Sequence, residues 1–490
     1  MLKTLSKDTL IYGFGKVAQK FIGFLLIPFY TRALSPEEYG VLDSIGTFVF
    51  LITTFLNMGL DSASSFYFFT GKSKEEKGQI LFTTFVLRLI TIIPSMILSF
   101  FSEIISDKIF GTKDYYWVVF ISCMIMPATV ILSDQENIYR FFREPWKYNI
   151  LTIIKTVSSA LLGILFVVFL KYGVNGVQLA SFATYLIVII YSYVFFTRKK
   201  YNFKFSFYWA KQMLKFGFPL VWAGIATWVY MSSNRFFLLK YKDLTEIGYY
   251  SIGNIFSQPI SLISMAFQMS FGVLFYQVYN EETNTDKTES KKLVSRTVEF
   301  FILITVPIAV FLSVFGKEIL NLATTKDYVN GIFVIPFLAF SLIFAQCLQM
   351  TDVGISISKK TWHFTWIIGV TAIANVILNI LVIPSYGYIG AAATTMIANL
   401  IYLIIVVVVS NKFFKVTYRY NRITAYMLFS FIISIIVPLI DFKLGFNLNI
   451  ASKIIIMICS FILPFIFGLI KIADIKNLYE NNIKAFIKRK

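Results

Sequence analysis

The chain has 490 residues, of which 57% are hydrophobic and 14% are charged, and its mean hydropathy is +0.72. Soluble proteins carry about 25% charged residues, so this composition excludes a soluble globular chain. The net charge of +19 does not indicate nucleic-acid binding, because the basic residues occur in many short segments and form no domain of their own.

Apolar segments of about 20 residues recur along the chain, and each could cross a hydrocarbon core of roughly 30 Å as an α-helix. They lack the apolar/polar alternation of barrel strands, so they predict an all-α polytopic membrane protein. We expect about fourteen spans, near residues 9–31, 41–63, 80–101, 116–138, 148–170, 174–196, 213–235, 248–275, 298–320, 329–351, 363–384, 388–410, 422–441 and 452–471. The first segment is too long for a signal peptide and has no small-residue cleavage site.

Connections between these spans are alternately rich and poor in basic residues. The rich ones contain Lys72, Lys74, Lys77, Arg140, Arg143, Lys147, Arg198, Lys199, Lys200, Lys204, Lys287, Lys291, Lys292, Arg296, Lys412, Lys415, Arg419 and Arg422, and the chain ends on Lys488, Arg489 and Lys490. By the positive-inside rule we expect these connections and both termini to be cytoplasmic.

An internal repeat organises the chain. The turn Tyr172-Gly173-Val174-Asn175-Gly176 recurs as Tyr386-Gly387-Tyr388-Ile389-Gly390, and Glu38-Tyr39-Gly40 recurs as Glu246-Ile247-Gly248. Each copy holds six spans, an even number, so both copies should have the same orientation in the membrane. The predicted parts are two parallel six-helix lobes at 1–197 and 213–411, a cytoplasmic linker at 198–212, and two extra helices with a basic tail at 412–490.

The first span carries the clearest candidate for a binding site. Lys16, Gln19, Lys20 and Gly23 recur at helical spacing and therefore share one face. Lys20 lies roughly 16 Å along the helix axis, too deep to reach the interface easily, so its ammonium should face a cavity or an acidic partner. The structural alternative is that buried acids such as Asp61 or Asp134 neutralise both lysines.

Four further cations lie within or at the ends of spans. Arg88 and Lys155 are candidates for the same anion site, although each could instead extend its side chain to the inner interface. Arg235 ends the seventh span, where it could line the site or anchor the helix at the interface. Lys453 should extend outward.

Signatures of enzymatic chemistry are missing from the sequence. It contains no P-loop, nucleophile elbow or zinc-ligand spacing, and its three cysteines all lie in apolar segments. We therefore expect no catalytic residue, metal site or cofactor.

The order of these features resembles a known family. Pro28-Phe29-Tyr30-Thr31-Arg32 followed by Ser35-Pro36-Glu37-Glu38-Tyr39-Gly40, the later Asn234-Arg235 with Glu246-Ile247-Gly248, and both Tyr-Gly-x-x-Gly turns are similar to polysaccharide biosynthesis proteins. These are Wzx-type flippases of the multidrug/oligosaccharidyl-lipid/polysaccharide exporter superfamily.

The resemblance implies a monomer in the cytoplasmic (inner) membrane of a bacterium. It implies that undecaprenyl-pyrophosphate-linked oligosaccharide is moved to the outer leaflet by alternating access, for O-antigen, capsule or exopolysaccharide synthesis. The implied partners are membrane lipid, a polysaccharide polymerase and glycosyltransferases. Lys16 and Lys20 are the best matches to the family's luminal cations, which would bind pyrophosphate and acidic sugars.

Three other functions remain open. A cation-coupled multidrug exporter and a lipid II flippase would share the fold, but the exporter would need acids where the first span has lysines. A membrane glycosyltransferase or polymerase would need a large catalytic loop, whereas the longest outer connection expected here is near residues 102–115.

Overall fold

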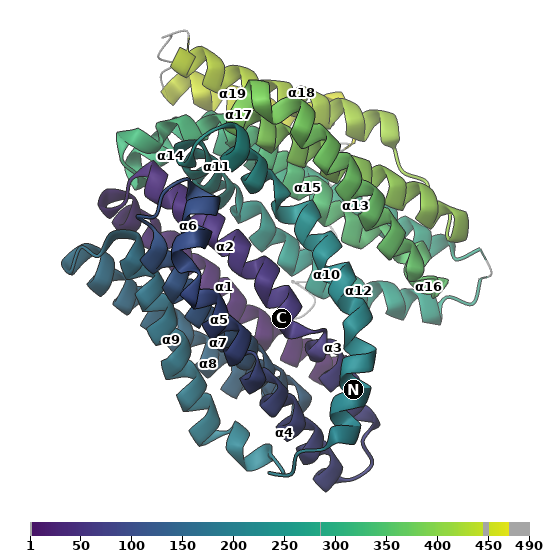
Figure 1. Cartoon of the computed structure of the whole chain (residues 1–490). Helices are drawn as coiled ribbons and strands as arrows, with labels where there is room; N and C mark the ends of the chain where they lie inside the picture. The colour runs from purple at the N-terminus through teal and green to yellow at the C-terminus, as the bar shows by residue number, and fades with distance from the viewer. Residues whose placement is uncertain (1, 285, 444–449, 470–490) are drawn as a thin grey trace, which may run out of the picture. The chain divides into compact units, whose positions relative to one another are not determined.

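The structure, a computed structural model, describes residues 2–284, 286–443 and 450–469. Helices account for nearly all of these residues, and no strand occurs among them (Figure 1). The predicted all-α class is therefore confirmed. The chain groups into two compact units: unit 1 is Met1–Ser251, Ala323–Tyr328 and Ile368–Ala391, and unit 2 is Ile252–Leu322, Val329–Ile367 and Ala392–Lys490.

Unit 1 holds the first half of the chain and the start of the second. Its helices are α1 (Leu2–Ala33), α2 (Pro36–Asn57), α3 (Leu60–Thr70), α4 (Lys74–Ile90), α5 (Ile92–Phe100), α6 (Ser102–Phe110), α7 (Tyr116–Phe141), α8 (Pro145–Gly163), η1 (Ile164–Phe169), α9 (Gly173–Phe195), η2 (Thr197–Lys200), α10 (Phe207–Tyr241) and most of α11 (Leu244–Ser257). The helix α7 packs against α9, α5, α2 and α4, while α1 packs on α8.

Unit 2 is built mainly from the later helices. These are α12 (Pro259–Glu281), α13 (Thr288–Val314), α14 (Gly316–Ala323), η3 (Lys326–Val334), α15 (Ile335–Thr351), α16 (Val353–Ile357), α17 (Trp362–Phe413), α18 (Tyr420–Pro438), η4 (Leu439–Lys443) and α19 (Ile450–Ile466). Here α13 packs against α15, α18, α12 and α19. The middle of α17, residues 368–391, belongs to unit 1.

The helices can be compared with the predicted spans. Among the described residues, ten segments are long and apolar enough to cross a membrane. Each segment is one helix or a run of consecutive helices. One of them, the 52-residue α17, is interrupted at Gly387 and covers both predicted spans at 363–384 and 388–410. Further helices α1, α10 and α19 lie over the predicted first, seventh and fourteenth spans. Fourteen membrane crossings remain a prediction, and so do the two six-helix lobes: α10, expected to open the second lobe, packs within unit 1 against α2 and α3.

Polar residues begin several of these helices. Ser35 and Glu38 form a capping box at the start of α2: the Ser35 hydroxyl accepts from the Glu38 backbone N–H at 3.2 Å, and the Ser35 N–H donates to Glu38 Oε2 at 2.8 Å. Ser73 caps α4 and Ser206 caps α10 in the simpler way, each accepting a backbone N–H three residues ahead. These side chains satisfy N–H groups that have no partner within the helix.

In each copy of the repeat, the glutamate of the first motif lies against the Tyr-Gly-x-x-Gly turn. Gly173 and Gly387 have φ of +55° and +53°, a backbone region that favours glycine. A Cβ at Gly173 would lie 2.9 Å from Glu38 Oε1, and a Cβ at Gly387 would overlap the carboxylate of Glu246. That carboxylate accepts the Tyr388 backbone N–H at 2.9 Å. In both copies of the repeat, a glutamate carboxylate thus lies against the glycine of the turn.

Two glycines allow a close helix crossing between the starts of α2 and α11. A methyl group at Gly40 would overlap the carbonyl oxygen of Leu244, and one at Gly248 would overlap that of Pro36. Leu244 and Gly248 lie the same number of positions after Pro36 and Gly40. The contact is therefore reciprocal between the copies and depends on backbone alone.

Candidate functional site

The face predicted on the first span lies beside a small polar cavity in unit 1. Lys16, Gln19 and Lys20 are exposed on α1. The cavity, of about 250 Å³, lies between α1, α8 and α9. Its lining includes Gln19, Gly23, Ile22, Leu26, Lys155, Thr156, Ser159, Ser181, Thr184 and Tyr185. The structure thus brings Gln19 and Lys155 to one cavity, whereas Lys16 and Lys20 lie outside its lining.

Lys155 has an acidic partner. Its ammonium lies 3.2 Å from Glu136 Oε1 on α7 and over the ring of Tyr185 at 5.5 Å from the centroid. The side chain is 24% exposed, so it could also reach an anion in the cavity. Its charge is already balanced by the carboxylate.

Arg88 is fully buried within a polar cluster formed by α3, α4, α7 and the end of α2. Its guanidinium donates to Asp61 Oδ1 at 2.8 Å and to the backbone oxygen and Oδ1 of Asn57 at 3.1 and 3.0 Å. Asp61 also accepts from the side chains of Asn57, Ser133 and Asn137. Arg88 therefore does not extend to the interface, and Asp61 pairs with it rather than with the first-span lysines.

Arg235 on α10 forms an ion pair with α2. Its Nε lies 2.9 Å from Asp43 Oδ2, and its guanidinium lies over the ring of Tyr250 at 4.7 Å. An Nη1–H also donates to Asn234 Oδ1 at 3.0 Å. The side chain is 11% exposed, so Arg235 joins helices of the two copies more clearly than it presents a charge to a ligand.

The sequence prediction of outward extension was wrong for Lys453. Its side chain is fully buried and lies 2.6 Å from Glu318 Oε1 and 2.7 Å from Asp441 Oδ2. Burial is tolerated because two carboxylates compensate the lost hydration of the ammonium. This cluster ties α19 and η4, both in the predicted C-terminal extension, to α14 of unit 2.

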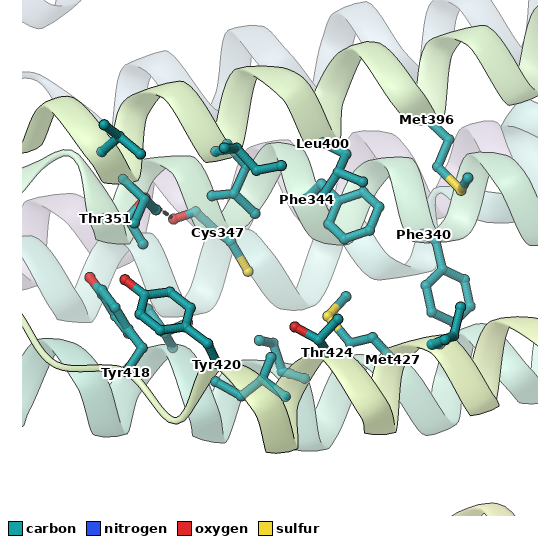
Figure 2. Close-up of a pocket in the computed structure, with 18 of the residues that line it drawn as sticks. Phe340, Phe344, Cys347, Thr351, Met396, Leu400, Tyr418, Tyr420, Thr424 and Met427 are labelled. Atoms are coloured by element: carbon teal, nitrogen blue, oxygen red, sulfur yellow. Dashed lines mark hydrogen bonds between the residues drawn. The ribbon is translucent and has the colours of Figure 1, made fainter.

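A larger cavity, about 630 Å³, lies in unit 2 between α13, α15, α17 and α18. Figure 2 shows Phe340 and Met396 at one end, and Tyr418, Tyr420 and Thr351 at the other. Apolar and aromatic side chains such as Phe344, Leu400 and Met427 form most of its wall. Burial raises the pKa of Tyr418, so its hydroxyl stays neutral at this polar end.

Sequence reasoning missed this cavity and most of the acidic partners. The signal for the partners was weak: Asp43, Asp61 and Glu136 are single acids in apolar segments, and nothing in one sequence says which cation each one meets. Within the described residues, no group of three His, Cys, Asp or Glu side chains could hold a metal ion.

Comparison with known proteins identifies the fold and the family. The chain is 25% identical over 309 residues to a protein of the Lsg locus of Haemophilus influenzae, covering 61% of this chain and 72% of that protein. A solved structure of the lipid II flippase MurJ in an inward closed conformation matches with a TM-score of 0.70 and 17% identity, covering 97% of this chain and all of the other.

An inward-facing MATE multidrug transporter of the MOP superfamily matches with a TM-score of 0.61 and 14% identity, over 83% and 95% of the two chains. The fold is thus the one that the MurJ and MATE structures share. The family model described as polysaccharide biosynthesis protein matches residues 29–332, more than half of the chain. This multi-pass membrane chain therefore belongs to the polysaccharide biosynthesis protein family.

Proposed function

We propose that the protein exports a lipid-linked anionic oligosaccharide from the cytoplasmic to the outer leaflet by alternating access. The observation that carries this proposal is the apolar cavity of unit 2, which ends in polar side chains beside a basic segment. The segment contains Lys412, Lys415, Arg419 and Arg422. An apolar cavity whose polar end is flanked in sequence by basic residues suits an amphiphile that has a hydrocarbon chain and an anionic head.

The dimensions of the cavity fit a lipid chain. From Phe340 to Thr351 the wall follows α15 for about 16 Å at about 1.5 Å per residue. Its lining is apolar except for Thr351, Asn411, Tyr418, Tyr420 and Thr424. A prenyl segment would lie in this cavity, and its phosphates would lie near the basic segment at residues 412–422, which the positive-inside rule assigns to the cytoplasmic side.

Lys16 and Lys20 are proposed to bind the pyrophosphate or acidic sugars during translocation. Both are exposed on α1, one turn apart, and Gln19 lies beside them on the cavity of unit 1. Lys155 stands as a secondary contact through the same cavity. With the cell interior negative, moving two anionic charges outward at about 100 mV would yield up to roughly 4.6 kcal/mol.

Reconstituted vesicles test the proposal. Undecaprenyl-pyrophosphate-linked oligosaccharide is loaded into one leaflet, and its arrival in the other is read with a membrane-impermeant glycosidase. We expect Lys16→Ala with Lys20→Ala to slow export by at least about tenfold, since each lost charge-assisted hydrogen bond costs at least about 1.4 kcal/mol. The matched control is Lys72→Ala with Lys74→Ala, two exposed lysines outside the apolar segments.

The rival functions give different results. Transport of lipid II but not of the oligosaccharide lipid would identify a lipid II flippase, and transport of cationic drugs alone would identify a multidrug exporter. Wild-type export that the double alanine variant leaves unchanged, in folded protein, would exclude Lys16 and Lys20 as the anion site. O-antigen or capsule as the end product, with a polymerase and glycosyltransferases as partners, is proposed from the family alone.

A further inference from the structure

Asp134, on α7, is a buried acid with no role in the proposed anion site. Its side chain is fully buried, and among the described residues no donor reaches either carboxylate oxygen. In the same cluster, Asp61 accepts hydrogen bonds from four side chains. Ionised carboxylates need such donors, whereas a protonated one does not.

Arg88 lies within electrostatic range of both acids. Its two terminal nitrogens are used by Asp61 and Asn57, while its Nε has no hydrogen-bond partner within the part of the chain that the structure describes. The guanidinium thus pairs with Asp61 and has one N–H left that could be donated to a second acid. The charge of Arg88 and Asp61 already cancels, so an ionised Asp134 would leave a net buried negative charge.

The surroundings of Asp134 include the segment that joins the two copies. Tyr201, between η2 and α10, is the tyrosine of this segment on which an ionised Asp134 would act, and burial already raises the pKa of Tyr201 well above its usual value. The same segment docks on α4: the Asn202 N–H donates to the Gly78 carbonyl at 3.0 Å, and the Ser206 N–H donates to Thr83 Oγ1 at 3.2 Å. A change at Asp134 is therefore next to the segment that leads into α10.

The other charged side chains on the elements packed against α7 are paired with one another or lie near the ends of their helices, where none is buried: Glu37 and Glu38 of α2, Lys74, Glu75, Glu76 and Lys77 of α4, and Asp107 and Lys108 of α6. The helices α5 and α9 contain no acidic or basic residue, Lys155 of α8 pairs with Glu136, and Asp43 of α2 pairs with Arg235. Glu103 of α6 lies 3.7 Å from Lys113. The charged and titratable groups that act on Asp134 are Arg88, Asp61 and Tyr201.

We infer that Asp134 is a proton-binding site, and that its proton exchanges with water as Arg88 moves between Asp61 and Asp134. In the conformation described, Asp134 carries the proton and Arg88 pairs with Asp61. When the site opens, Asp134 gives its proton to a water molecule, and the carboxylate that forms accepts the Arg88 Nε–H. Arg88 stays charged throughout, and Asp61, whose side chain is 34% exposed, is left to solvent.

Coupling of this proton to transport rests on the proposed function, whereas proton binding itself does not. The first test is therefore independent of any transported substrate. Dicyclohexylcarbodiimide reacts with a buried protonated carboxyl group, whose O–H adds across the carbodiimide to give a stable acylurea after rearrangement. The purified wild-type protein is labelled between about pH 5 and about pH 9, and the modified residue is located by mass spectrometry.

We expect Asp134 to be labelled at low pH, and labelling to fall about tenfold per pH unit above its midpoint. The paired acid Glu136 should stay unlabelled throughout. Two results would overturn the inference: no labelling of Asp134 at any pH, or labelling that does not change with pH, which would mark a permanent structural proton.

The second test measures transport under an imposed pH gradient. Wild-type export should respond to the gradient, and Asp134→Asn should lose that response, with Asp114→Asn, an exposed loop acid, as the control. Asp134→Glu serves if the asparagine variant does not fold. A variant that keeps the wild-type response refutes coupling. Failure of the wild type to move any lipid-linked sugar refutes the proposed function, while the labelling still decides proton binding.

Discussion

Four basic side chains inside the apolar segments have an acid on another helix. Arg88, Lys155, Arg235 and Lys453 lie within 4 Å of a carboxylate that is 27, 19, 192 and 135 positions away in sequence, respectively. A cation in hydrocarbon is costly unless it is paired, so each pair holds two helices together as well as balancing a charge. Lys16 and Lys20 are exposed on α1.

Replacing Arg88 with alanine should destabilise unit 1. It would leave Asp61, whose side chain is 34% exposed, without its cation and Asn57 without a donor, and loss of hydrogen bonds to a charged group costs about 1.5–3 kcal/mol. We expect the thermal unfolding midpoint in detergent to fall by several degrees. Asp61→Asn with Arg88→Met should recover part of the loss, and a double variant no more stable than the single one would argue against the pairing.

Replacing Lys453 with methionine should loosen the C-terminal helices. Glu318 and Asp441 would then face each other without the ammonium between them, although Lys317 remains 3.5 Å from Asp441. Limited proteolysis should cut between α18 and α19 faster than in the wild type. The companion variant Ile455→Met, on the same helix but exposed, should be cut at the wild-type rate.

At the scale of helices, glycines determine how closely elements approach. The crossing of α2 and α11 at Gly40 and Gly248 leaves no room for a side chain, whereas Gly46 on the same α2 has no atom near the position of its Cβ. The two positions thus form an internal comparison within one helix.

Gly40→Ala should be damaging and Gly46→Ala nearly neutral. The added methyl at residue 40 meets a backbone carbonyl, which cannot move without shifting a helix, while the methyl at residue 46 meets open space and favours helix. Thermal unfolding of the two variants in parallel measures the difference. Equal midpoints would mean that the crossing at Gly40 is loose.

At the scale of the whole molecule, apolar segment length predicted the helices and their order well. The predicted span at 213–235 lies within the longer helix α10, which begins at Phe207 because Ser206 caps it. The acidic partners and the unit 2 cavity could not be predicted, since both depend on which distant helices pack together. A single sequence shows how far Arg88 lies from the end of its apolar segment, but it does not show that Asp61 lies 2.8 Å from the guanidinium.

Orientation in the membrane gives a prediction for the whole chain. If the basic connections are cytoplasmic, a cysteine introduced at Asp107 should react with a membrane-impermeant maleimide added to intact cells, because α6 lies in a basic-poor connection. A cysteine at Lys74 should react after the cells are opened. The reverse pattern would invert the assignment of both termini.

The crossing of α2 and α11 also predicts how residues 40 and 248 vary among related sequences. Because each glycine faces the backbone of the other copy, a larger residue at either position separates the helices and frees the remaining glycine from its constraint. In related sequences we therefore expect both positions to be glycine or both to be replaced. A sequence with a larger residue at only one of the two positions should be rare.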